Sequence, residues 1–177
     1  CSPPPAGQGT AKVGLTPYKL TDKEADLLQS LGLDNKTQLL LFNAPEEALS
    51  LSFQIYMLGP DGNWQKSGGG GISLGEEREP VSRLSGSLSI VQQRQYALDI
   101  TITCGSVAAF KTGEFYRDAE PMAVAREYLN SFTEIALDQE IPIYLLAGSG
   151  EGSMCTHSLE DYFAPEKFSD TDFVQII

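Results

Sequence analysis

The sequence has little of the chemistry that catalytic and metal sites use most. Its 177 residues include one histidine, three cysteines and one tryptophan. Basic residues are also scarce, because 12 Lys+Arg stand against 24 Asp+Glu and give a formal net charge of −12 at pH 7. Proteins that bind nucleic acid or anionic lipid surfaces use clustered Lys and Arg. We therefore expect neither as a partner of this chain.

Long hydrophobic runs are missing as well. Stretches such as Leu39 to Phe42 are short, whereas a membrane-spanning helix needs about 20 predominantly apolar residues. The composition is that of an ordinary globular protein, 41% hydrophobic and 20% charged. A chain of this length buries enough surface to fold without metal or disulfide support. We expect a single globular β-rich domain over residues 18–177.

The first residues have a distinctive composition. The chain has no initiator Met and begins with Cys1, which is followed by the uncharged run SPPPAGQGT. This segment resembles the mature end of a bacterial lipoprotein, in which a signal peptide is cleaved just before a lipid-bearing Cys. A chain cut by chance at a Cys is the alternative. The resemblance implies lipid attachment at Cys1, a Pro/Gly-rich tether over residues 1–17, and an extracytoplasmic protein that contacts the cell membrane through its lipid only.

Alternating hydrophobicity predicts a mainly β fold. Apolar residues recur at every second position over residues 49–58, 84–90 and 96–104, which is typical of strands with one face in a core. The turn Gly59-Pro60-Asp61-Gly62 predicts a hairpin between the first of these strands and a strand at Trp64. Further strands are predicted over 38–43, over 141–147 in a hairpin with 153–158, and over 173–177. The glycine run Gly68-Gly69-Gly70-Gly71 is expected to be a loop.

Two helices are predicted beside these strands. Thr21-Asp22-Lys23-Glu24 has the spacing of a capping box and begins a short helix that ends at Gly32. A longer helix is predicted over about 121–138, where Met122, Ala125, Leu129, Phe132 and Ala136 form an apolar stripe. We expect a mainly β or α+β fold: an antiparallel β-sandwich or bent sheet with this long helix packed on it.

The order of these parts also resembles that of uncharacterised surface lipoproteins of Gram-positive bacteria. The shared parts are the short acidic helix, the Ala44-Pro45 turn, a strand, the Gly62-Asn63-Trp64 turn and a glycine run. Such proteins have no assigned activity. The resemblance therefore implies a location and no mechanism.

His157 is the residue on which any Ser-His-Asp or Cys-His site would depend, with Asp161 or Asp138 to orient it. No G-x-S-x-G motif accompanies it. Cys155 and His157 have one residue between them, but zinc sites normally use two close pairs or three histidines. We predict no catalytic residue, metal or other cofactor, and a surface His157 whose replacement by Ala changes stability by less than about 0.5 kcal/mol.

The other two cysteines leave two alternatives open. Cys104 continues the apolar face of the strand at 96–104 and is expected to be buried. Export permits a disulfide between Cys104 and Cys155, whereas an apolar interior equally suits a free thiol.

Tyr56 and Trp64 are the candidate ligand-stacking residues, with cross-strand packing as the structural alternative. Tyr56 is notable because it lies on the polar face of its predicted strand. The favoured function is a non-enzymatic, cell-surface-tethered interaction or envelope-structural lipoprotein with a protein or carbohydrate ligand. The alternative is a carbohydrate-binding accessory module, and a hydrolase of unknown substrate is third.

Overall fold

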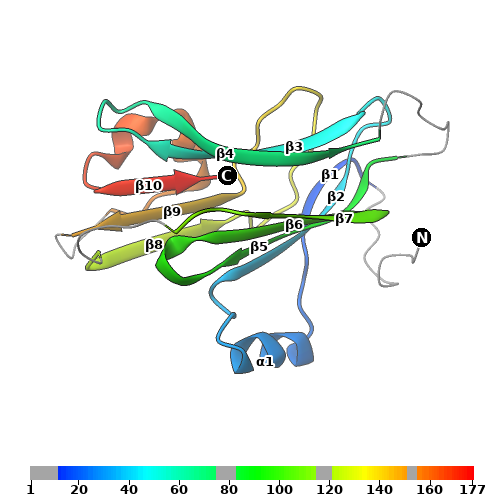
Figure 1. Cartoon of the computed structure of the whole chain (residues 1–177), viewed down its shortest axis with the longest axis horizontal. Coiled ribbons are helices and arrows are strands. Elements are labelled where there is room, and N and C mark those ends of the chain that lie inside the picture. Colours follow the sequence, from blue (N-terminus) through cyan, green and yellow to red (C-terminus); the bar gives the residue numbers. More distant parts are fainter. Residues whose placement is uncertain (1–11, 75–82, 115–120, 151–154) are drawn as a thin grey trace. The chain divides into compact units, whose positions relative to one another are not determined.

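The computed structural model describes residues 12–74, 83–114, 121–150 and 155–177 (Figure 1). Strands make up 45% of the structure and form two antiparallel sheets, which confirms the mainly β prediction. The chain divides into two compact units. Unit 1 comprises residues 1–51, 71–115 and 130–139, and unit 2 comprises residues 52–70, 116–129 and 140–177.

The first sheet, sheet A, has the strand order β1-β2-β5-β6-β7. Its central strands place apolar residues opposite one another, with Leu40 opposite Leu88 and Ile90 opposite Ile100. These side chains are almost completely buried and form part of the core of unit 1. The strands of sheet A are β1 (Gly14–Pro17), β2 (Thr37–Asn43), β5 (Ser85–Gln92), β6 (Leu98–Cys104) and β7 (Ser106–Lys111).

Strand β1 lies within residues 1–17, which the sequence assigns to the tether. Its residues pair with β2, and Leu15 exchanges backbone hydrogen bonds of 2.8 and 3.0 Å with Thr133. Gly14 lies so close to the Phe132 ring and to the Thr133 carbonyl that a Cβ atom would collide with both. This part of the sequence therefore belongs to the fold of unit 1.

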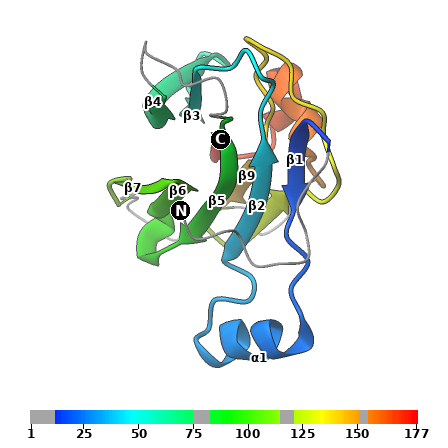
Figure 2. The ribbon, with the colours of Figure 1, turned by 90° about the vertical axis from the view of Figure 1, so that its right-hand side faces the viewer.

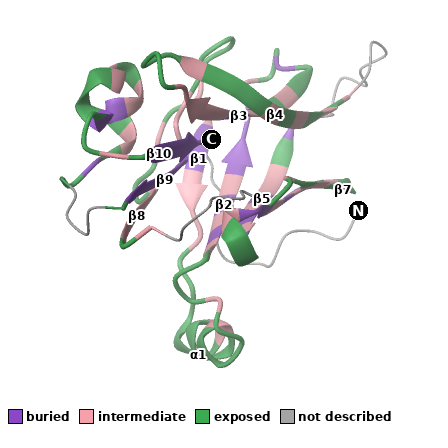
Figure 3. Cartoon of the chain, turned by 60° about the vertical axis from the view of Figure 1, so that its left-hand side comes forward, coloured by how far each residue is buried: buried purple, intermediate pink, exposed green. Residues whose placement is uncertain are grey.

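The helix α1 (Asp22–Ser30) begins with the predicted capping box. The Glu24 carboxylate accepts a hydrogen bond of 2.7 Å from the Thr21 backbone N–H, and the Thr21 hydroxyl accepts one from the Glu24 N–H. No residue of α1 is buried, and Leu27 and Leu31 are 60% and 62% exposed. Figure 2 shows the helix beyond the ends of β1 and β2, and Figure 3 shows that most of its residues are exposed.

The second sheet, sheet B, has the order β4-β3-β10-β9-β8. All residues of its central strands β9 and β10 are buried (Figure 3). On one face, the 3-10 helices η2 (Leu159–Phe163) and η3 (Pro165–Phe168) pack on a core of Leu145, Ala147, Phe168, Val174 and Ile176. The strands of sheet B are β3 (Ser50–Leu58), β4 (Trp64–Ser73), β8 (Ala123–Tyr128), β9 (Tyr144–Ser149) and β10 (Phe173–Ile176).

The long helix predicted over 121–138 was wrong. Its first part is strand β8, which pairs with β9 from Ala123 opposite Ser149 to Tyr128 opposite Tyr144, and the rest is non-helical. Met122, the first residue of the predicted stripe, is largely exposed. The apolar spacing matched a helix, but pairing with the completely buried β9 decides the local structure, as tertiary context commonly does.

Two further details of the strand prediction were wrong. β9 pairs with β8 and β10, and residues 155–158 are not a strand, so the hairpin predicted between 141–147 and 153–158 is not formed. The glycine run Gly68–Gly71, expected as a loop, lies inside β4. The predicted hairpin of β3 and β4 is confirmed, and the Gly59 N–H donates to the Asn63 carbonyl across its turn.

Candidate functional site

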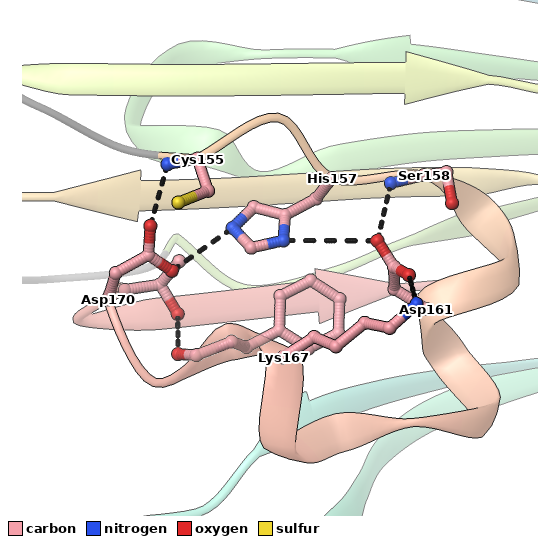
Figure 4. A network of polar contacts seen from close by, with 8 residues as sticks. Cys155, His157, Ser158, Asp161, Lys167 and Asp170 are labelled. Carbon is pink, nitrogen blue, oxygen red and sulfur yellow. Dashed lines mark hydrogen bonds and ion pairs between the residues drawn. The ribbon is translucent and has the colours of Figure 1, made fainter.

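His157 lies inside unit 2, at the centre of a polar network (Figure 4). The residue is only 5% exposed, and its ring packs on Phe168 with 4.6 Å between ring centroids. Its Nδ1 atom lies 3.9 Å from Asp161 Oδ2, and its Nε2 atom lies 3.3 Å from Asp170 Oδ1. The second contact has the distance of an ion pair without the alignment of a hydrogen bond. The predicted surface position of His157 was therefore wrong.

Asp161 links this network to the start of η2. Its carboxylate accepts hydrogen bonds from Lys167 Nζ at 2.6 Å and from the Ser158 backbone N–H at 2.8 Å. These two bonds, with that from Lys167 the stronger influence, hold the pKa of Asp161 below its usual value. Of the two carboxylates proposed to orient His157, Asp161 is the one beside it, whereas Asp138 belongs to unit 1.

Cys155 and Asp170 complete the network. The Cys155 backbone N–H donates to Asp170 Oδ2 at 2.6 Å, which lowers the pKa of Asp170. The thiol is hydrogen-bonded to the same carboxylate, which raises the pKa of Cys155. A catalytic cysteine needs the opposite shift, because the thiolate is the nucleophile. The contacts of Cys155 and His157 with Asp161 and Asp170 stabilise the segment that contains η2 and η3.

Cys104 and Cys155 are free thiols in the structure. Cys104 is partly exposed and not buried as predicted, because it is the last residue of β6, whereas Leu98, Ile100 and Ile102 of that strand are buried. In the described part of the chain, no group of three His, Cys, Asp or Glu side chains is arranged to hold a metal ion. No helix in these ranges is long and apolar enough to span a membrane.

A second cluster in unit 2 combines aromatic rings with one carboxylate; we call Tyr56, Trp64, Glu140, Tyr162 and Phe163 the aromatic–carboxylate patch. The Tyr56 hydroxyl donates to Glu140 Oε1 at 3.0 Å, and the Tyr162 hydroxyl donates to Glu140 Oε2 at 2.9 Å. Glu140 is exposed, and Phe163 is 68% exposed. The three remaining residues are partly exposed.

The rings of the patch pack on one another at an angle. Tyr162 lies 6.0 Å from Tyr56 and 5.4 Å from Trp64 between ring centroids, with interplanar angles of 39° and 36°. The Trp64 Nε1–H donates to the Tyr162 carbonyl at 2.9 Å, so Trp64 fixes the position of η2. Phe163 lies 5.0 Å from Tyr162. The rings of Tyr56, Trp64 and Tyr162 are therefore not coplanar, whereas a flat stacking platform for a sugar ring would need coplanar rings.

Burial raises the pKa of both tyrosines above the usual value, and the hydrogen bonds to Glu140 add to this effect. Both phenols are therefore protonated at neutral pH and act as donors to the carboxylate.

The structure brings together Tyr56 and Trp64, which the sequence singles out, and adds Glu140, Tyr162 and Phe163, which it does not. Tyr56 lies on the face of β3 that η2 and η3 cover, which explains an aromatic residue at a position that reads as polar. Glu140 is far from both tyrosines in the sequence, so no local pattern joins them. Cys1 lies outside the described residues.

The chain matches no protein-family model, no curated protein and no solved structure. Its function is therefore argued from its own residues.

Proposed function

We propose that this protein is a non-enzymatic interaction or envelope-structural lipoprotein of the bacterial cell surface, anchored by a lipid on Cys1. The uncharged, Pro-rich segment after Cys1 supports the anchor. The net charge of −12 supports attachment through the lipid alone, since an acidic surface is repelled by anionic headgroups.

The observation that carries the non-enzymatic part is the environment of His157. Its side chain is 2% exposed, and each ring nitrogen faces a carboxylate. A general base needs one nitrogen directed at a nucleophile or at substrate. The proposal therefore gives His157 a structural role and assigns binding to the aromatic–carboxylate patch.

A carbohydrate-binding accessory module is the second candidate. The observation that favours it is the presence of Tyr56 and Trp64 beside an exposed carboxylate, because sugar sites combine aromatic rings with acidic hydrogen-bond acceptors. The tilt of the rings favours a protein ligand over a flat sugar face.

Lipid attachment is tested by mass spectrometry of the mature protein from its own cell, together with membrane fractionation. We expect a lipid mass on the N-terminal peptide and release of Cys1→Ala from the membrane. A mature protein that begins upstream of Cys1, or that carries no lipid, contradicts the anchor.

The interaction role is tested by cross-linking intact cells through a photoreactive residue at position 163. We expect a protein partner that is captured from the wild-type background and lost when Tyr162 is also replaced by Ala. Capture of polysaccharide in place of protein would favour the carbohydrate module. A hydrolytic turnover that His157→Ala abolishes would favour the hydrolase.

A further inference from the structure

The hydrogen-bond donors of the aromatic–carboxylate patch are already used within it. The Tyr56 and Tyr162 hydroxyls each have one hydrogen, and both hydrogens are donated to Glu140. The Trp64 indole N–H is donated to the Tyr162 carbonyl. What these side chains still offer a ligand is therefore acceptor capacity only.

That remaining capacity is electron-rich throughout. An ionised carboxylate has about four lone-pair sites, of which the two tyrosines occupy two. The phenol oxygens keep their own lone pairs, and the ring faces carry the negative side of the aromatic quadrupole. Both tyrosine–glutamate hydrogen bonds lie at the solvent-exposed surface, so a ligand can reach them.

The charge of Glu140 has no cationic partner in the described part of the chain, where the ion pairs involve other carboxylates. The exposed Glu160 on η2 adds negative charge, and Lys167 of the neighbouring η3 is paired with Asp161. The patch is thus complementary to a positive, donor-rich group.

We propose that the aromatic–carboxylate patch binds an arginine side chain of a protein partner. A guanidinium group is planar, has five N–H donors and no acceptor, and stacks on aromatic rings. It can donate to the free lone pairs of Glu140 while its face lies on Tyr162 or on the exposed Phe163. This inference rests on the proposed interaction role and names the chemistry of the partner.

A sugar fits the patch less well. Sugar hydroxyls both donate and accept, and a sugar site normally supplies both kinds of group. Here the three side-chain donors are occupied, and the rings are inclined to one another by 36° and 39°. A cation needs neither free donors nor coplanar rings.

The chain contains its own reporter for the test, because Trp64 is its single tryptophan. The acetylated, amidated tripeptide Gly-Arg-Gly is titrated against the whole protein at fixed ionic strength while Trp64 fluorescence is recorded. We expect a saturable fluorescence change with Gly-Arg-Gly and weaker binding of Gly-Lys-Gly. The neutral citrulline peptide should bind more weakly than Gly-Arg-Gly by about tenfold or more, because it cannot make a charge-assisted hydrogen bond to Glu140.

Two variants show whether the patch is the site. Glu140→Gln removes the charge of an exposed side chain and is expected to raise the Kd for Gly-Arg-Gly by about tenfold. Glu166→Gln removes the same charge from η3 outside the patch and is expected to leave the Kd within about twofold, as for a distant rim charge.

Equal binding of the arginine and citrulline peptides overturns the inference, and so does an unchanged Kd in Glu140→Gln. Saturable binding of an oligosaccharide that the arginine peptide does not displace also overturns it. These outcomes leave the lipid anchor and the cross-linking result untouched, so they are distinguishable from a failure of the proposed function.

Discussion

His157 is held by an aromatic ring on one side and by a carboxylate near each nitrogen. Since the ring is buried against Phe168, we expect His157→Ala to lower the free energy of unfolding by about 2 kcal/mol, because the substitution leaves a cavity and removes the contacts of both ring nitrogens with carboxylates. Urea denaturation of the purified protein measures this loss. Thr156→Ala, at an exposed neighbouring position, is the control and should change stability by less than about 0.5 kcal/mol. An unchanged midpoint in His157→Ala would contradict the structural role.

Asp161 makes a pH-dependent contribution to stability whose sign follows from its lowered pKa. A carboxyl group with a lower pKa in the folded state stabilises the protein above its unfolded pKa of about 3.9, and the contribution is lost as the pH falls through the folded value. We expect Asp161→Asn to be less stable than the wild type at pH 7, and the difference to shrink below about pH 4. Denaturation curves measured from about pH 2 to about pH 7 would test this. Glu160→Gln on the same 3-10 helix should follow the wild-type profile.

Gly86 lies where β5 passes β6 so closely that a Cβ atom would collide with the Thr103 carbonyl oxygen. The obstacle is backbone of the paired strand, which cannot move aside without breaking the ladder. We expect Gly86→Ala to destabilise the protein by about 1–3 kcal/mol. Gly113→Ala is the matched control, because, apart from its chain neighbours, no atom of the described residues lies within 4 Å of its Cβ position. Thermal unfolding that shifts equally in both variants would disprove the close approach.

At the scale of elements, the sequence predicts the strands in which apolar residues alternate with polar ones or follow one another without interruption. Residues 38–43, 49–58, 84–90 and 173–177 alternate or run apolar, and β2, β3, β5 and β10 lie there. The stripe at 121–138 failed because spacing alone does not show that a buried strand is available to pair with it. The patch was half predicted: Tyr56 and Trp64 are marked by residue type, whereas Glu140 and Tyr162 reach them only through the packing of η2 on sheet B.

The helix α1 is stabilised locally and contributes no buried residue. Its Thr21 side chain caps the helix, and removal of such a cap costs about 1 kcal/mol of helix stability. We expect Thr21→Ala to speed amide hydrogen exchange within residues 22–30 while the urea midpoint of the whole protein stays unchanged, because local unfolding of this helix exposes no core. A fall in the global midpoint as large as the local effect would show that α1 packs against the rest of the protein.

At the scale of the whole molecule, the net charge predicts how strongly the protein binds a lipid surface. With a net charge of −12 and a sequence pI of about 4.4, the unlipidated chain is expected not to bind vesicles that contain anionic lipid at neutral pH and low salt, where electrostatic effects are largest. Vesicle flotation of Cys1→Ala, with zwitterionic vesicles as the control, measures this. Co-flotation that depends on anionic lipid would reveal a basic surface that the composition does not suggest.

Strand β10 occupies the middle of sheet B, between β3 and β9. β3 is synthesised early, but it pairs with β10 through Met57 opposite Gln175 and Tyr56 opposite Ile176, near the end of the described chain. The nascent chain therefore carries β3 with one unpaired edge for most of its synthesis, and pairings of such long range are slow to form. Unit 2 therefore cannot complete its sheet from the N-terminal end as the chain is made. A chaperone that shields unpaired strand edges during synthesis would act on this chain in the interval before residue 175 emerges.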